Sequence, residues 1–160
     1  MSSNREIVER YAAAFRLAMG GGSYDELNAL RHPDFVEDWP QSRERIRGGD
    51  NMRLIDENRP NKVADGAVER FVGTDDQFLF SPMMTVVHVA GTGDDFTIVA
   101  RMKYAQGDEW YAVMLCTVKD RRIWRASSYF APTYEAPSWR AGWVEPMDES
   151  TQSTVGLSDA

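Results

Sequence analysis

The sequence predicts an α+β domain in which helices come first along the chain and an antiparallel sheet follows. Apolar residues recur at helical spacing in the first part of the chain, and after residue 66 their period falls from about 3.6 towards 2. Short turn sequences at 91–95, 106–108 and 119–121 separate the last four candidate strands. Helices followed by a meander of antiparallel strands define the α+β class, and a strongly curved sheet wrapped on the helices would form a cone with one open end.

Three helices are expected in the N-terminal part. The first begins with a capping box, because Ser3 is followed three residues later by Glu6, and the glycines at 20–22 end it. Ser23 and Glu26 repeat the capping pattern for a second, short helix. The helices are expected at 4–19, between Ser23 and Pro33, and at 50–58.

One strand is expected among the helices and five after them, at 34–39, 67–73, 83–90, 96–105, 109–118 and 122–131. The basic run at 43–47 contains Glu44 and lies between predicted elements. We interpret it as a solvated loop, with a basic substrate clamp as the alternative.

The chain reads as one domain over residues 1–145, with no internal repeat. Residues 132–145 follow the last predicted strand and are expected to run as an ordered extended segment, because Pro132 and Pro137 prevent further sheet pairing. Residues 146–160 are polar and non-periodic and are expected to be a disordered tail.

Net charge, the length of apolar runs and the cysteine count indicate which partners, compartments and cofactors to expect. The formal net charge is −7 and the sequence pI is about 4.8, so nucleic acid is not an expected partner. No apolar run is long enough to predict a membrane span or a signal peptide, and a cytoplasmic protein is expected. Cys116 is the single cysteine, and neither a metal site nor a nucleotide-binding loop is predicted, so no cofactor is expected.

The segments "VERYAAAF" and "HPDFVEDWP", together with the order of the elements, resemble the nuclear transport factor 2-like superfamily over about residues 4–131. That superfamily includes SnoaL-like polyketide cyclases, ketosteroid isomerases and limonene-epoxide hydrolases. The resemblance implies a cystatin-like cone, a curved sheet around an apolar pocket, and a homodimer.

Ketosteroid isomerases give the most informative residue-by-residue resemblance. Their helix-one tyrosine, which donates a hydrogen bond to the enolate oxygen, corresponds to Tyr11, and their general-base aspartate corresponds to Asp38. Their second oxyanion donor falls near Met114, which cannot donate. The resemblance thus implies Asp38 and Tyr11 as catalytic residues, without the complete steroid-isomerising set.

The other two groups are less similar at their catalytic positions. The epoxide hydrolases' Tyr-x-Asn and Arg-x-Asp motifs become Val36-x-Asp38 and Arg101-x-Lys103, and Ser128 replaces the aspartate before their Tyr-Phe. The Tyr-Phe-Asp ending of many SnoaL-like proteins ends here in Ala131. Epoxide hydrolysis is therefore not expected.

Asp38 has two interpretations. It could be a general base that takes a proton from carbon while Tyr11 holds the developing oxyanion, or it could be a structural partner of Arg101 or Arg53. If Asp38 faces the pocket, alternation along the strand puts Val36 on the same face. His88 is the third candidate catalytic residue, with a structural role in its strand as the alternative.

The residues expected to bind the substrate are mostly apolar, as suits a flat hydrophobic ligand: Val36, Trp39, Arg101, Trp110, Met114, Ser128 and Phe130. The predicted function is acid–base chemistry without a cofactor on a hydrophobic carbonyl compound, by an isomerase, cyclase or dehydratase (lyase) type of reaction. The alternative is a non-catalytic small-molecule-binding or dimerisation module of the same fold. The aromatic segment 132–145 is expected to pack across a homodimer, with a lid over its own pocket as the alternative.

Overall fold

The computed structural model describes residues 3–58, 85–103 and 109–147. The strand expected at 67–73, the turn expected at 106–108 and the part of the expected tail from residue 148 onwards lie outside them. Along the chain the elements are α1 (Asn4–Met19), α2 (Asp25–Ala29), β1 (Arg31–Trp39), β2 (Glu44–Arg47), α3 (Gly49–Glu57), β3 (Thr85–Thr92), β4 (Asp95–Lys103), β5 (Glu109–Lys119), β6 (Arg122–Pro132) and the 3₁₀ helix η1 (Ser138–Trp143).

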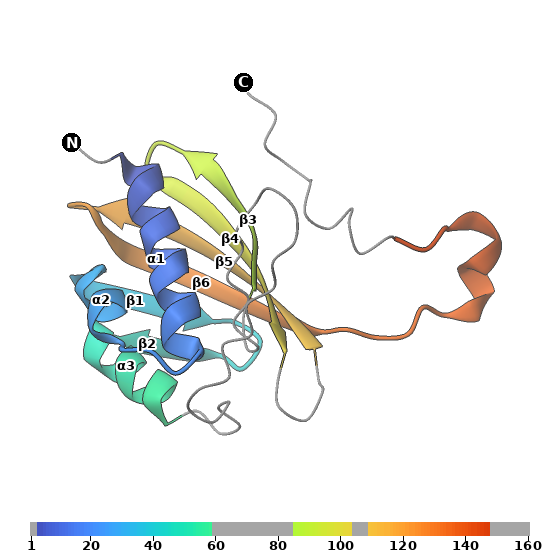
Figure 1. Cartoon of the computed structure of the whole chain (residues 1–160), viewed down its shortest axis with the longest axis horizontal. Coiled ribbons are helices and arrows are strands. Elements are labelled where there is room, and N and C mark those ends of the chain that lie inside the picture. Colours follow the sequence, from blue (N-terminus) through green and yellow to red (C-terminus); the bar gives the residue numbers. More distant parts are fainter. Residues whose placement is uncertain (1–2, 59–84, 104–108, 148–160) are drawn as a thin grey trace.

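The strands form one curved sheet in the order β2-β1-β6-β5-β4-β3 (Figure 1). β1 and β6 pair in parallel, and the other neighbours pair antiparallel. The expectation of a loop at 43–47 is wrong for most of that run, since Glu44–Arg47 is the edge strand β2, in which Arg45 lies opposite Asp38. The predicted α+β class, with helices on a curved and mainly antiparallel sheet, is confirmed.

The first predicted capping box is present. The Ser3 hydroxyl accepts a hydrogen bond from the Glu6 backbone N–H, and the Glu6 carboxylate accepts one from the Ser3 N–H at 2.7 Å. The second is absent, because α2 has Tyr24 at its N-cap without a side-chain cap bond. Two orphan N–H groups are thus satisfied at the start of α1, which anchors the long helix that covers the sheet.

All three helices lie against the same, concave face of the sheet. α1 crosses it and contacts β3, β4 and β6, while α3 contacts β1 and β2 (Figure 1). The main core lies between them and includes Val8, Leu27 and Phe35. No helix among the described residues covers the opposite, convex face. In the described part of the chain, no helix has both the length and the apolar character needed to cross a membrane.

After β6 the chain leaves the body of the molecule (Figure 1). Thr133 still donates a backbone hydrogen bond to the Glu109 carbonyl at 2.9 Å, so sheet pairing ends there and not before Pro132. We call residues 134–147 the C-terminal arm. The expectation that this segment is extended is wrong for part of it, because Ser138–Trp143 forms a 3₁₀ helix that begins directly after Pro137.

Candidate functional site: an acid–base cavity on the concave face

Strand β1 decides which acidic side chain faces the helices. Phe35, Glu37 and Trp39 point to the concave face, whereas Val36 and Asp38 point to the convex face. Side chains therefore alternate between the two faces, as expected for a strand. Asp38, which was expected to face the pocket, is on the face away from it. The carboxylate that faces the helices belongs to Glu37.

A cavity lies between α1 and the concave face. The volume open to the centre of a water-sized sphere is about 50 Å³, enough for a few waters at roughly 10–15 Å³ each. Apolar side chains form most of its wall, and four polar ones interrupt them. The lining residues are Tyr11, Ala12, Phe15, Arg31, Glu37, Trp39, Met52, Ile98, Ala100, Met102, Ala112, Met114, Ser128 and Phe130.

Glu37 is held by two hydrogen bonds to one of its oxygens. Oε1 accepts from the Ser128 hydroxyl at 2.6 Å and from the Trp39 indole N–H at 2.9 Å. No hydrogen-bond partner of Oε2 is present among the described residues. Burial raises the pKa of Glu37, although the hydrogen bonds from Ser128 and Trp39 and the charge of Arg31 oppose the rise. A carboxyl with one fixed and one free oxygen and a raised pKa suits proton transfer to and from a ligand.

Tyr11 reaches the cavity from α1 and is 3% exposed. Its oxygen accepts a hydrogen bond from Arg31 Nε at 3.3 Å, and no described group accepts its own proton. Burial raises the pKa of Tyr11 above its ordinary value, so the hydroxyl stays protonated. Tyr11 can therefore donate a hydrogen bond to a ligand. The hydrogen bond that the Tyr11 oxygen accepts from Arg31 polarises the O–H group and strengthens it as a donor.

Arg31 and Asp56 form a buried ion pair beside the cavity. Arg31 Nη2 lies 3.0 Å from Asp56 Oδ2, and the two side chains are 1% and 0% exposed. The other terminal nitrogen of Arg31, Nη1, is buried without a hydrogen-bond partner. Leaving such a donor unpaired costs free energy, so a ligand oxygen that accepted a hydrogen bond from Nη1 would bind with an advantage.

These groups give the cavity a defined chemistry. Among the described residues at the cavity, Arg31 and Asp56 offset each other's charge, and Glu37 is the acidic residue of the wall. Tyr11 and Arg31 each offer a donor that no described residue uses, and Glu37 offers one oxygen. Among the described residues, no three or more His, Cys, Asp or Glu side chains cluster so as to hold a metal ion.

Asp38, expected to be the general base, lies outside this cavity. It accepts hydrogen bonds from Arg45 at 2.6 and 2.7 Å on the convex face. These bonds lower the pKa of Asp38. The alternative, a structural ion pair, describes its position correctly, but the partner is Arg45 and neither Arg101 nor Arg53. Asp38 pairs with Arg45 because strand β2 places the two residues opposite each other in the sheet. The prediction of a loop at 43–47 did not include Arg45 in the sheet.

The structure divides the other predicted site residues between the two faces. Val36 lines a groove on the convex face, and sheet pairing places His88 opposite Val99 and Arg101 opposite Tyr111, which are on that face too. These three are not brought to the cavity. Trp110 is on the concave side and packs near Met102, without lining the cavity. The predicted residues that do line it are Tyr11, Trp39, Met114, Ser128 and Phe130.

Sequence reasoning missed Glu37, Arg31 and Asp56. A signal for Glu37 was present, because it alternates with Phe35 and Trp39, and a face with two large aromatic residues is the one that a sheet buries. Nothing local marks Arg31 and Asp56 as a pair, since they lie 25 residues apart on different elements.

The helices packed on one face of a curved sheet form a nuclear transport factor 2-like fold, with the cavity between α1 and the sheet. Similar solved structures include an NTF-2-like protein of unknown function from Burkholderia xenovorans (TM-score 0.68, 23% identity, covering 91% of this chain and 95% of that one). A candidate ketosteroid isomerase from Kribbella flavida has a TM-score of 0.66 at 18% identity, with 91% and 90% covered.

An LEH-like epoxide hydrolase from M. tuberculosis is more distant, with a TM-score of 0.52 at 16% identity and 80% and 82% covered. No protein-family model matches the sequence, and no curated protein matches it. At these identities the likeness establishes the fold, and the chemistry has to be argued from the cavity.

Proposed function

We propose that the protein is a cofactor-independent enzyme that uses Glu37 as general acid and base on a small, hydrophobic carbonyl compound, in a reaction of the isomerase, cyclase or dehydratase type. The observation that carries the proposal is the convergence of three groups on one apolar cavity. Glu37 contributes an oxygen without a partner and a raised pKa, and Tyr11 and Arg31 contribute unused donors.

The proposed step is an enolisation. Glu37 Oε2 takes a proton from the carbon next to the carbonyl group, and the electron pair of the C–H bond moves through the new C=C bond onto the carbonyl oxygen. Hydrogen bonds from Tyr11 and from Arg31 Nη1 stabilise the oxyanion. In a β,γ-unsaturated substrate the enolate is a dienolate, and the Glu37 carboxylic acid then returns its proton to the γ-carbon. The C=C bond moves into conjugation with the carbonyl group, without oxidation or reduction.

The charges of the cavity favour a neutral substrate. Asp56 already balances the guanidinium of Arg31, so a carboxylate substrate would add an uncompensated negative charge beside Glu37. A carbonyl oxygen can accept from both donors without that cost. The apolar wall would bind the hydrocarbon part, and the thioethers of Met52, Met102 and Met114 can shift to admit it.

Isotope exchange tests the proposal without knowledge of the product. One- and two-ring cyclic ketones are incubated with the protein in D₂O, and NMR follows the loss of protons next to the carbonyl. Glu37→Gln should reduce the exchange rate by about 10²- to 10⁴-fold, the usual contribution of a general base. Asp38→Asn is the matched control, since it changes the adjacent carboxylate on the opposite face, and it should exchange like wild type.

No exchange above buffer background with wild-type protein across the ketone panel would contradict the proposal. So would equal rates for wild type and Glu37→Gln. If Asp38→Asn were the impaired variant, the base would have to be sought on the convex face.

The small volume of the cavity favours a second candidate function, a non-catalytic module of the same fold. Trp39 and Phe130 pack edge to face in its wall with their ring centres 5.6 Å apart, and they take up space that a ligand would need. In that case the ketones would not exchange. Saturation-transfer NMR with the same ketones separates a module without a ligand from a binder without catalysis.

A further inference from the structure

Apolar side chains separate the cavity from solvent. The polar groups of its wall, on Tyr11, Arg31, Glu37 and Ser128, belong to residues that are at most 5% exposed. The described lining residues that keep partial exposure are all apolar: Phe15, Trp39, Ala112, Met114 and Phe130. A ligand on its way to Glu37 therefore has to pass these apolar side chains, which form the mouth of the cavity.

Trp39 and Phe130 form an aromatic pair at the mouth, with ring centres 5.6 Å apart and ring planes at 85°. Their backbones are tied together. β1 ends at Trp39, directly before Pro40, and the side-chain amide of Gln41 then takes the place of a further strand residue. It accepts a hydrogen bond from the Phe130 N–H and donates one to the Phe130 carbonyl. We therefore expect the mouth to widen by rotation of the two aromatic side chains and not by movement of the backbone.

Rotation of Trp39 has a chemical consequence at Glu37. The indole N–H donates to Glu37 Oε1 at 2.9 Å, so the ring cannot leave its place without giving up that bond. The Ser128 hydroxyl holds the same oxygen at 2.6 Å and does not depend on Trp39. A ligand that passes without displacing Trp39 thus meets a carboxyl held by two hydrogen bonds, and a ligand that displaces it meets a carboxyl held by one.

The volume of the cavity matches a ligand with a single ring. About 50 Å³ is open to the centre of a water-sized sphere, which corresponds to three to five waters, or about 100–150 Å³ of liquid. A ketone with one six-membered ring has a comparable volume, whereas two fused rings exceed it. Single-ring ketones therefore fit with Trp39 in place, and fused-ring ketones require it to move.

We infer that Trp39 determines the specificity of the cavity: together with Phe130 it excludes ligands larger than a single ring, and it holds Glu37 in position when a single-ring ligand is bound. The inference rests on the proposed function, for which it names the substrate class, single-ring ketones. It also gives the aromatic pair a role as a gate, which differs from simply filling the cavity.

Binding of two ketones tests the size limit without turnover. Cyclohexanone should bind to wild type with a Kd at least about tenfold lower than that of decalone, which has two fused rings, since tenfold is the lower end of what a hydrophobic pocket achieves. Trp39→Leu and Phe130→Leu each remove one ring of the gate, and each should tighten decalone binding by at least about tenfold. Ligand-observed NMR titration measures both ketones, and two variants keep the test valid if one fails to fold.

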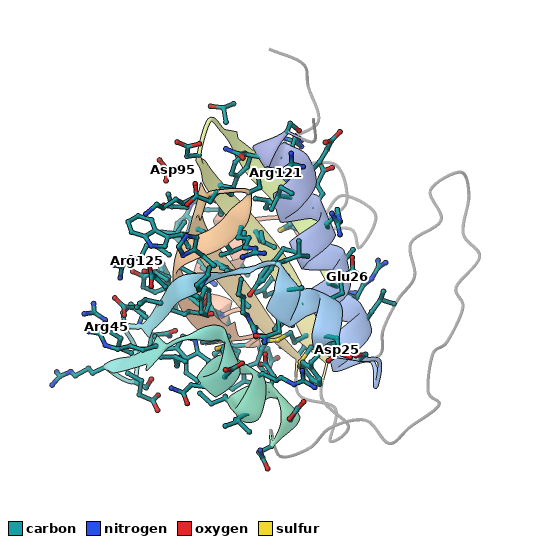
Figure 2. All side chains as sticks on the ribbon, turned by 90° about the vertical axis from the view of Figure 1, so that its left-hand side faces the viewer. Asp25, Glu26, Arg45, Asp95, Arg121 and Arg125 are labelled. Carbon is teal, nitrogen blue, oxygen red and sulfur yellow. The ribbon has the colours of Figure 1, made fainter. Side chains whose placement is uncertain are left out.

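Trp124→Leu is the matched control, because it removes a tryptophan from the sheet outside the cavity. The Trp124 ring packs against Lys119 and Arg125, at 5.0 and 4.7 Å from the ring centre. Arg125 appears on the side of the sheet away from α1 in Figure 2. This variant should keep the wild-type preference for cyclohexanone.

The titration of Glu37 tests the second role of Trp39. Burial raises the pKa of Glu37, and the hydrogen bond from Trp39 opposes the rise. Trp39→Phe keeps a ring at the gate but lacks the N–H, so Glu37 should titrate at higher pH while cyclohexanone is still preferred. Phe130→Leu keeps the N–H and should titrate like wild type. ¹³C NMR of the carboxyl carbons measures the titration, with the Glu37 signal identified by its absence in Glu37→Gln.

These variants leave in place the other charged or titratable groups that interact with Glu37, which are Tyr11 on α1, Arg31 on β1, Asp56 on α3 and Cys116 on β5. The size limit is wrong if wild type binds decalone as tightly as cyclohexanone, if it binds neither ketone, or if both leucine variants gain nothing for decalone. Equal Glu37 titrations in wild type and Trp39→Phe would overturn the positioning role.

The outcomes also separate this inference from the proposed function. Selective binding of cyclohexanone without any deuterium exchange would contradict the enolisation and support the gate. Deuterium exchange into decalone as fast as into cyclohexanone, with wild-type protein, would contradict the gate and support the enolisation.

Discussion

At the scale of single residues, Glu37 couples the stability of the fold to pH. Burial raises its pKa, so the folded protein keeps this proton at pH values where the unfolded chain has released it. This contribution to the free energy of unfolding is fully present below the unfolded pKa of about 4.3. It decreases as the pH rises towards the folded pKa and is lost above that value.

Glu37→Gln should remove this dependence. The amide oxygen can still accept from Ser128 and Trp39, while the titration is lost. The free energy of unfolding of the variant relative to wild type should rise with pH across that window, by at most about 1.4 kcal/mol per pH unit. Urea unfolding of both proteins between pH 4 and 8 measures the difference, and parallel stability curves would contradict the assignment.

The buried pair of Arg31 and Asp56 makes a second prediction at this scale. Arg31→Met alone should destabilise the protein by about 3–5 kcal/mol, because it removes the cation that lies 3.0 Å from the fully buried Asp56 carboxylate. Arg31→Met/Asp56→Leu removes both charges and should be more stable than the single variant. Equal losses in the single and double variants, measured by urea unfolding, would show that the charge pairing is not what the single change disturbs.

At the scale of elements, the end of β3 depends on one glycine. Gly91 has φ +127°, and an added Cβ would lie 2.7 Å from the Phe96 Cα and closer still to the Asp95 carbonyl oxygen. Gly91→Ala should cost about 1–3 kcal/mol, the usual range for local backbone strain. Gly93→Asn is the control, because Gly93 has φ +66° and open space, a conformation that asparagine tolerates. Thermal unfolding should show a clearly larger loss for Gly91→Ala.

Strand β1 shows where sequence reasoning about an element stops. The strand was predicted and its alternation of side chains is confirmed. The resemblance implied that Asp38 faces the pocket, but the residue that faces it is Glu37. A strand has two faces, and a shift of one residue exchanges them completely. Packing of Phe35 and Trp39 under the helices fixed the phase, and it placed Glu37 in the cavity.

At the scale of the whole molecule, the C-terminal arm should be separable from the fold. Its 3₁₀ helix contains no buried residue, and the last sheet bond is made by Thr133. Truncation after Thr133 should therefore leave the thermal midpoint, measured at a concentration where wild type is monomeric, within about 4 °C of wild type. The homodimer expected from the sequence, with this arm packed across it, predicts that the same truncation abolishes self-association in sedimentation. A collapsed midpoint would mean that the arm supports its own chain.

The sequence by itself determined the order of the predicted helices and strands, the capped first helix and the mainly antiparallel sheet, because these follow from local periodicity, capping and turn chemistry. Tyr11 as a site residue came from the resemblance to ketosteroid isomerases. Tertiary structure alone decided which face of β1 is buried, that 44–47 joins the sheet, and that Arg31 meets Asp56 across 25 residues. Those outcomes depend on packing between elements distant in the chain, where side chains of similar local propensity compete for one buried surface.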